Sequence, residues 1–100
     1  MSILTPEKEP AAIKIAIRGE KLIVDLSDGR TLAVPLEWYP RLLHAGRKER
    51  EKWTLLGNGY AIEWPDLDEH IGVAGLLAGH RSGESRKSFE RWLSARKTRH

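Results

Sequence analysis

The chain has 100 residues, 40% of them apolar and 31% charged, which is typical of a single small globular domain with one hydrophobic core. It contains no cysteine, which excludes disulfides, thiolate nucleophiles and cysteine-based zinc sites, and no apolar run approaches the ~20 residues that a membrane-spanning helix needs. The net charge of +3 is unevenly distributed, because residues 1–79 carry −2 and residues 80–100 carry +5.

The first predicted element is a β-hairpin that follows a flexible arm over residues 1–11. Apolar and polar residues alternate over residues 13–18, which predicts a half-buried strand. Glycine at the first position of the turn Gly19-Glu20 favours a type II′ hairpin that returns as a strand over residues 21–26. In this register three apolar pairs share one face of the sheet: Ile17 with Leu22, Ile15 with Val24, and Ile13 with Leu26.

The next turn, over residues 27–29, is predicted to have a three-residue loop. A two-residue Asp28-Gly29 loop would turn Leu32 and Val34 to the wrong face, because a one-residue slip reverses every side chain. A type I turn followed by Gly29 in the left-handed region keeps both residues on the apolar face. The sequence therefore predicts a three-stranded antiparallel meander.

The remainder of the predicted domain, which spans residues 12–79, covers the apolar face of that meander. Proline and glycine punctuation divides it into short elements of both kinds, so the predicted fold class is α+β. The predicted elements are short helices over 40–45 and 47–53, strands over 53–56 and 60–64 that form a second small hairpin, and a short helix that follows residues 66–69 and ends near Gly79.

Residues 80–100 are predicted to be a basic tail, with a linker over 81–84 and an amphipathic helix from Ser85. Its apolar stripe consists of Phe89, Trp92 and Leu93, and its cations include Arg86, Lys87, Arg91, Arg96 and Lys97. Four interpretations are open: the stripe docks on the domain, it enters a partner's groove, the cations contact phosphates, or the tail is merely solvated. A membrane anchor is disfavoured, because one short helix with few apolar residues binds weakly.

The densest acidic cluster is Asp66, Asp68 and Glu69. Paired carboxylates can hold a divalent ion or transfer a proton. We favour the simpler interpretation, in which Asp66 or Asp68 caps the following helix. The four histidines show no metal-ligand spacing, so no metal or other cofactor is predicted.

The aromatic residues divide into two predicted groups. Trp53 and Trp64 lie beside strand ends and are expected to fill the core. Trp38 and Tyr39 precede a proline in a connecting segment and are expected to be partly exposed, which makes them candidates for a partner surface. Arg41 is expected either to pair with a nearby carboxylate such as that of Glu37 or to meet an anion.

Several sequence pieces between residues 26 and 79 carry a resemblance to a known family. They are SDGR, PLEWYPRLL, ER followed two residues later by W, and WPDLDEHIGVAGLLAG. With these pieces the chain resembles the domain-of-unknown-function 2442 family, which implies a small bacterial α+β protein. Relatives are often encoded beside small proteins of the 4160 unknown-function family, which implies an antitoxin-like partner of a toxin-like protein. Some relatives add a helix-turn-helix DNA-binding domain, but none fits into residues 80–100.

Three functional hypotheses follow, each for a cytoplasmic protein that forms a homodimer if the strand over 13–18 is a free sheet edge. The first is a non-enzymatic regulatory module that binds a small toxin-like protein through Trp38, Tyr39, Phe89, Trp92 and Leu93. The second is a protein that binds DNA or RNA through Arg86, Lys87, Arg91, Arg96 and Lys97. The third, ranked last, is a metal-dependent hydrolase that uses Asp66, Asp68 and Glu69.

Overall fold

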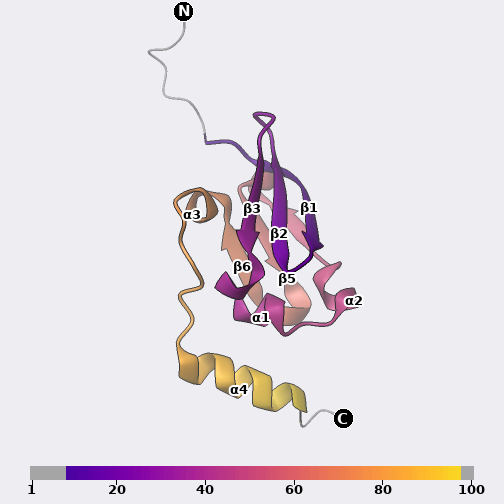
Figure 1. Ribbon diagram of the computed structural model, residues 1–100, viewed down its shortest axis with the longest axis vertical. Helices are drawn as coiled ribbons and strands as arrows, with labels where there is room; N and C mark the ends of the chain where they lie inside the picture. Colours follow the sequence, from indigo (N-terminus) through magenta and orange to yellow (C-terminus); the bar gives the residue numbers. More distant parts are fainter. Residues whose placement is uncertain (1–8, 98–100) are drawn as a thin grey trace, which may run out of the picture.

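Two three-stranded antiparallel sheets pack face to face in the computed structural model, which describes residues 9–97 (Figure 1). The first sheet has the order β1-β2-β3, with strands Ala12–Arg18, Lys21–Leu26 and Thr31–Pro35. The second has the order β4-β5-β6, with strands Thr54–Leu56, Ala61–Trp64 and Glu69–Gly72. The predicted α+β class is confirmed. The second hairpin that was predicted, β4-β5, forms a three-stranded sheet together with β6.

Short helices connect and close the sheets. The helices are α1 (Pro40–Leu43), α2 (Arg47–Arg50), α3 (Val73–Leu77) and α4 (Arg86–Lys97), and single 3₁₀ turns lie at Leu36–Trp38, Gly57–Gly59 and Pro65–Leu67. The first two helices are shorter than predicted. Figure 1 shows α1 and α2 at one end of the two sheets, with α4 beyond α1 at the same end.

The first hairpin has the predicted two-residue loop with a different turn type. Gly19 and Glu20 both have positive φ, at 53° and 64°, which makes the turn type I′ rather than type II′. The predicted pairs Ile17 with Leu22 and Ile15 with Val24 are confirmed. Both turn types keep the same register, so the prediction of strand pairing does not depend on the turn type.

The predicted pairing of Ile13 with Leu26 is wrong. A bulge between Ala12 and Lys14 sets Ala12 opposite Leu26, so Ala12 is buried and the Ile13 side chain is 61% exposed. The predicted arm also ends earlier than expected, because the Ala11 N–H donates to Ser27 Oγ and the Ala11 carbonyl accepts from the Ser27 N–H. Residues 1–8 of the arm lie outside the described residues.

The three-residue turn over residues 27–29 is confirmed. Val24 pairs with Leu32, Leu22 pairs with Val34, and the Leu26 N–H donates to the Arg30 carbonyl across the loop. Gly29 has a φ of 95°, as the left-handed position of this turn requires.

Replacing Gly29 by valine is expected to lower the free energy of unfolding by more than about 1 kcal/mol, because a β-branched residue resists positive φ. An added Cβ at Gly29 has no atom within 4 Å, so the loss reports backbone strain and not a clash. A urea titration measures it, and an unchanged midpoint would contradict the turn assignment.

The predicted start of the last helix of the domain, directly after residues 66–69, is also wrong. The chain makes the 3₁₀ turn Pro65–Leu67, passes through Asp68 at a φ of 52°, and returns as β6 beside β5. Helix α3 begins only at Val73, with Gly72 as its N-cap. Neither Asp66 nor Asp68 caps that helix, so the predicted capping role is wrong.

The core lies between the two sheets and the helical end of the domain. Trp64 and Leu42 are completely buried, and the Trp64 indole N–H donates to the Arg50 carbonyl at 3.1 Å. Trp64 is therefore the core residue that was predicted, whereas Trp53 is only half-buried. Within residues 9–97, no helix has the length and apolar character needed to cross a bilayer.

Candidate partner-binding groove

Helix α4 is the predicted tail helix, and it is docked against α1 and α2 by charged contacts near both of its ends. An extended linker leaves α3 and brings α4 across the end of the domain below α1 (Figure 1). Glu84, just before the helix, pairs with Arg41 of α1, and Arg96, in its last turn, pairs with Glu49 of α2. No side chain of α4 that the structure describes is fully buried. The two ion pairs hold α4 near both ends, and half-buried Trp92 packs against the core between them.

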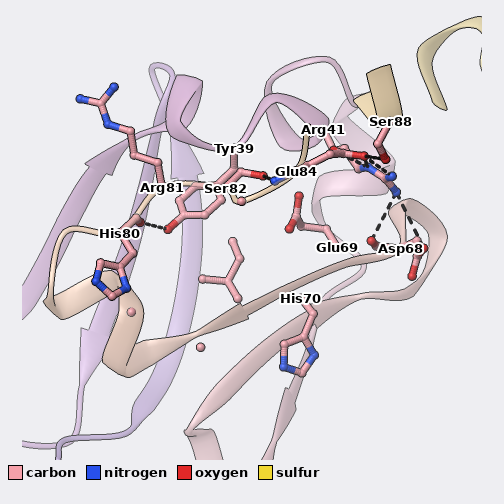
Figure 2. Close-up of a pocket in the computed structure, with 14 residues that line it drawn as sticks. Tyr39, Arg41, Asp68, Glu69, His70, His80, Arg81, Ser82, Glu84 and Ser88 are labelled. Carbon is pink, nitrogen blue, oxygen red and sulfur yellow. Dashed lines mark hydrogen bonds and ion pairs between the residues drawn. The ribbon is translucent and has the colours of Figure 1, made fainter. Parts of the chain in front are cut away.

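Arg41 is the anchor at the first end (Figure 2). Its Nε donates to Glu84 Oε1 at 3.0 Å, and its Nη1 donates to the Leu67 carbonyl at 2.8 Å. The Ser88 hydroxyl donates to Glu84 Oε2 at 2.7 Å. These bonds to Arg41 and Ser88 lower the pKa of Glu84 below its usual range. The partner expected from sequence was a nearby carboxylate such as Glu37, and the observed one lies 43 residues away.

The second end is held by a two-bond contact between Arg96 and Glu49. Arg96 Nη1 donates to Glu49 Oε2 at 2.8 Å, and Arg96 Nη2 donates to Oε1 at 2.6 Å. Glu49 also accepts the Gly46 N–H at 2.8 Å. These hydrogen bonds from Arg96 are the main reason why the pKa of Glu49 is lowered to about 2. Between the two ends, the Trp92 ring lies 5.2 Å from the Arg41 guanidinium carbon and 4.6 Å from that of Arg96.

Acid is expected to release α4. The pKa of Glu49 falls from 4.5 to about 2 in the folded chain, so its contribution is complete above pH 4.5 and is lost as the pH falls toward 2. The lowered pKa of Glu84 acts in the same direction. The protection factors of the α4 amides, which compare their exchange rates with those of an unfolded chain at the same pH, should therefore fall over this range. Glu49→Gln should exchange faster already at neutral pH and show a weaker pH dependence, and equal pH dependence in both proteins would contradict the assignment.

A groove of about 690 Å³ lies between α4 and α1, beside the Arg41–Glu84 contact. Its apolar lining comes from Trp38 and Leu43 on the domain and from Phe89 and Leu93 on α4. The Phe89 ring meets the His44 ring edge-on at a centroid distance of 5.2 Å. The groove is thus built from segments about 50 residues apart in sequence.

Three of the five residues predicted to bind a partner line this groove, namely Trp38, Phe89 and Leu93. Trp92 does not line it, since it packs between Arg41 and Arg96. The expectation that Tyr39 is partly exposed is wrong. Tyr39 is buried, and its hydroxyl donates to the His80 carbonyl at 2.8 Å. Tyr39 therefore ties the linker to the domain and does not line this groove.

Docking of α4 leaves some of the residues predicted to bind nucleic acid exposed and engages another in an ion pair. Arg86, Lys87 and Arg91 are exposed. Arg96 is engaged by Glu49, which neutralises its charge. The side chain of Lys97 lies outside the described part of the structure. Three exposed cations on one helix remain available for an anionic partner.

The acidic residues 66, 68 and 69 do not converge on one point. Asp66 lies 3.5 Å from the Lys52 ammonium, and exposed Asp68 lies 3.9 Å from Arg41 Nη1. Glu69 is half-buried and lines a pocket of about 540 Å³, where Figure 2 shows its carboxylate pointing toward Tyr39. Burial raises the pKa of Glu69. Among residues 9–97, no group of three or more histidines and carboxylates is arranged to hold a metal ion.

On the domain side of the groove, sequence reasoning found only Trp38. Leu43 and His44 were placed in a helix without a role, and Glu49 was given no part in holding α4. Leu43 follows the buried Leu42 and is the second apolar residue on a four-residue helix, which is the only local signal that another element covers it.

The model of DUF2442, a family of proteins of unknown function, matches residues 12–82 of the chain. The chain belongs to the DUF2442 family. A crystal structure of a protein of unknown function from Rhodospirillum rubrum is similar at 32% identity and a TM-score of 0.68, over 77% of this chain and 95% of that one. No curated protein matches the chain. The matched family region ends before α4, so the groove joins a DUF2442 domain to a helix outside the matched residues.

Proposed function

We propose that this DUF2442 protein is a non-enzymatic, cytoplasmic binding module whose groove between α1 and α4 holds a small toxin-like partner protein. The observation that carries the proposal is the position of Trp38, Phe89 and Leu93, which line one apolar groove. Apolar grooves of this kind accept the apolar face of a partner segment, with neighbouring charges setting its orientation.

Charges of both signs line the groove, and further cations lie beside it on α4. Arg81 and Arg86 line the groove, and Arg81 lies over the Trp38 ring at 5.0 Å. Exposed Lys87 and Arg91 extend the positive surface along α4. Glu84 also lines the groove, where Arg41 neutralises it, and exposed Glu37 and Glu90 line it as well. The charges of the lining therefore nearly balance, and carboxylates on a partner segment are favoured only beside the groove, along Lys87 and Arg91.

Nucleic-acid binding is the second candidate, and the exposure of Arg86, Lys87 and Arg91 favours it. Through the three exposed cations among the described side chains of α4, such binding would be independent of base sequence and sharply reduced by salt. It would not require the apolar groove, which separates it from the first candidate.

The two candidates are distinguished by capture experiments with the tagged full-length chain from its host, using matched serine variants of α4. Leu93→Ser changes the groove lining, whereas Arg91→Ser changes an exposed cation outside it. The proposal expects one stoichiometric protein that is lost with Leu93→Ser and retained with Arg91→Ser. Capture of only salt-labile nucleic acid that is lost with Arg91→Ser would overturn it in favour of the second candidate.

A further inference from the structure

The outer edge of β1 is a second surface, and the groove beside it shares no lining residue with the groove between α1 and α4. In the order β1-β2-β3, β1 is an outer strand of its sheet. Arg18 and Lys21 flank the two-residue hairpin loop, so they form a hydrogen-bonded pair, and the bonding pattern then alternates along the strands. The N–H and C=O groups of Ile15 and Ile17 consequently turn away from β2 toward the free edge.

This edge faces a groove of about 660 Å³ and not a flat solvent surface. One wall is the β1 segment that includes Ile15 and Ile17, and the opposite wall comes from α2 and the following segment, with Arg47, Arg50 and half-buried Trp53. The outward N–H and C=O groups of Ile15 and Ile17 can pair with an extended chain, while Trp53 offers an apolar surface for the side chains of that chain. This combination is the general geometry of β-strand addition.

Charge decides between the occupants of this edge. The groove is lined by Arg18, Arg47 and Arg50 against Glu20 and Glu51. The Arg50 guanidinium donates to main-chain carbonyls at 2.9 and 2.8 Å, so no carboxylate neutralises it there. A second copy of this chain would add the cations of its own β1, Lys14 and Arg18, to a positive groove.

We infer that the β1 edge binds an extended acidic segment of a partner protein as an added strand, with carboxylates that face Arg18 and Arg47. This site is separate from the α1–α4 groove and does not depend on it. Free outer edges are otherwise sites of uncontrolled association, and a positive groove beside the edge selects against pairing with a second copy.

The test is a selection of random short linear peptides displayed against the immobilised full-length chain. Selected peptides should be rich in Asp and Glu, and their binding should protect the Ile15 and Ile17 amides from hydrogen exchange. Arg47→Glu should weaken the binding about tenfold or more, because it reverses a charge in the groove wall. Lys48→Glu is the matched control, since Lys48 is an exposed α2 residue outside the groove lining, and its affinity should stay within about twofold of wild type.

Three results would overturn the inference. The first is a selection that returns no binding peptide, or one whose selected peptides are not enriched in Asp and Glu. Another is equal weakening by Arg47→Glu and Lys48→Glu, with no protection of the β1 amides. The third is a stable dimer in light scattering whose formation protects those amides, because a second copy would then occupy the edge.

Discussion

Replacing Gly59 by alanine is expected to lower the free energy of unfolding by about 3 kcal/mol, which is a large part of the stability of a small domain. Gly59 has a φ of +94°, where alanine is strained, and an added Cβ would lie 2.3 Å from the Ala12 carbonyl oxygen. That oxygen belongs to the buried start of β1, so relief requires movement of the backbone. The loss combines conformational strain with overpacking where the two sheets meet.

Gly57→Ala is the matched control in the same turn. Gly57 also has positive φ, at +58°, but an added Cβ meets only Tyr60 Cβ at 3.9 Å. Its expected cost is about 1 kcal/mol, since strain remains and the clash is absent. Urea titrations of both variants measure the difference, and equal costs would show that the approach of Gly59 to Ala12 has no energetic weight.

Arg41→Met is expected to cost about 2–3 kcal/mol and to release α4 from the domain. The Arg41 and Glu84 side chains are only 14% and 15% exposed, so truncation leaves a poorly hydrated carboxylate without its cation. It also removes the donor to the Leu67 carbonyl and the cation above Trp92. Chemical denaturation gives the cost, and hydrogen exchange of the α4 amides shows the release.

Arg30→Met provides the comparison for Arg41→Met. Arg30 pairs with Asp28 at 2.8 Å, but these side chains are 63% and 39% exposed, so the expected cost is far smaller than that of Arg41→Met. α4 exchange should be unchanged in Arg30→Met. If Arg41→Met left α4 exchange unchanged as well, α4 would be held by its apolar contacts and not by the Arg41–Glu84 pair.

The first sheet was predictable because its constraints are local. Only a three-residue loop over 27–29 keeps Leu32 and Val34 on the apolar face, and the observed register agrees. The bulge at Ile13 was not predictable, since the alternation of isoleucines continues through it. What displaces Ile13 is Ala12, which is buried where β1 meets Gly59.

The second sheet was half predicted for a similar reason. Strand β5 is bounded by Gly59 and Pro65, which are clear stop signals. Strand β6 is only four residues long and has one buried residue, Ile71, so its sequence lacks a period. The acidic residues before it were interpreted as helix caps, whereas Asp68 in fact occupies a left-handed turn position.

The candidate site was predicted mainly on its α4 side, with Trp38 as the one predicted residue on the domain. The apolar stripe of α4 was visible from its helical spacing, including Phe89 and Leu93. Its docking was not, because the pairs Arg41–Glu84 and Arg96–Glu49 join residues 43 and 47 positions apart. In a chain with 31% charged residues, no local pattern selects these partners.

We propose that the partner protein lies in the groove between α1 and α4. The most direct measurement places a photo-crosslinking amino acid at Leu93, inside the groove, or at Arg91, outside it, in the tagged full-length chain. Illumination in host extract should join the stoichiometric partner to the chain from Leu93 and much less from Arg91. A crosslink from Arg91 with none from Leu93, or no protein crosslinked from either position, would contradict the account.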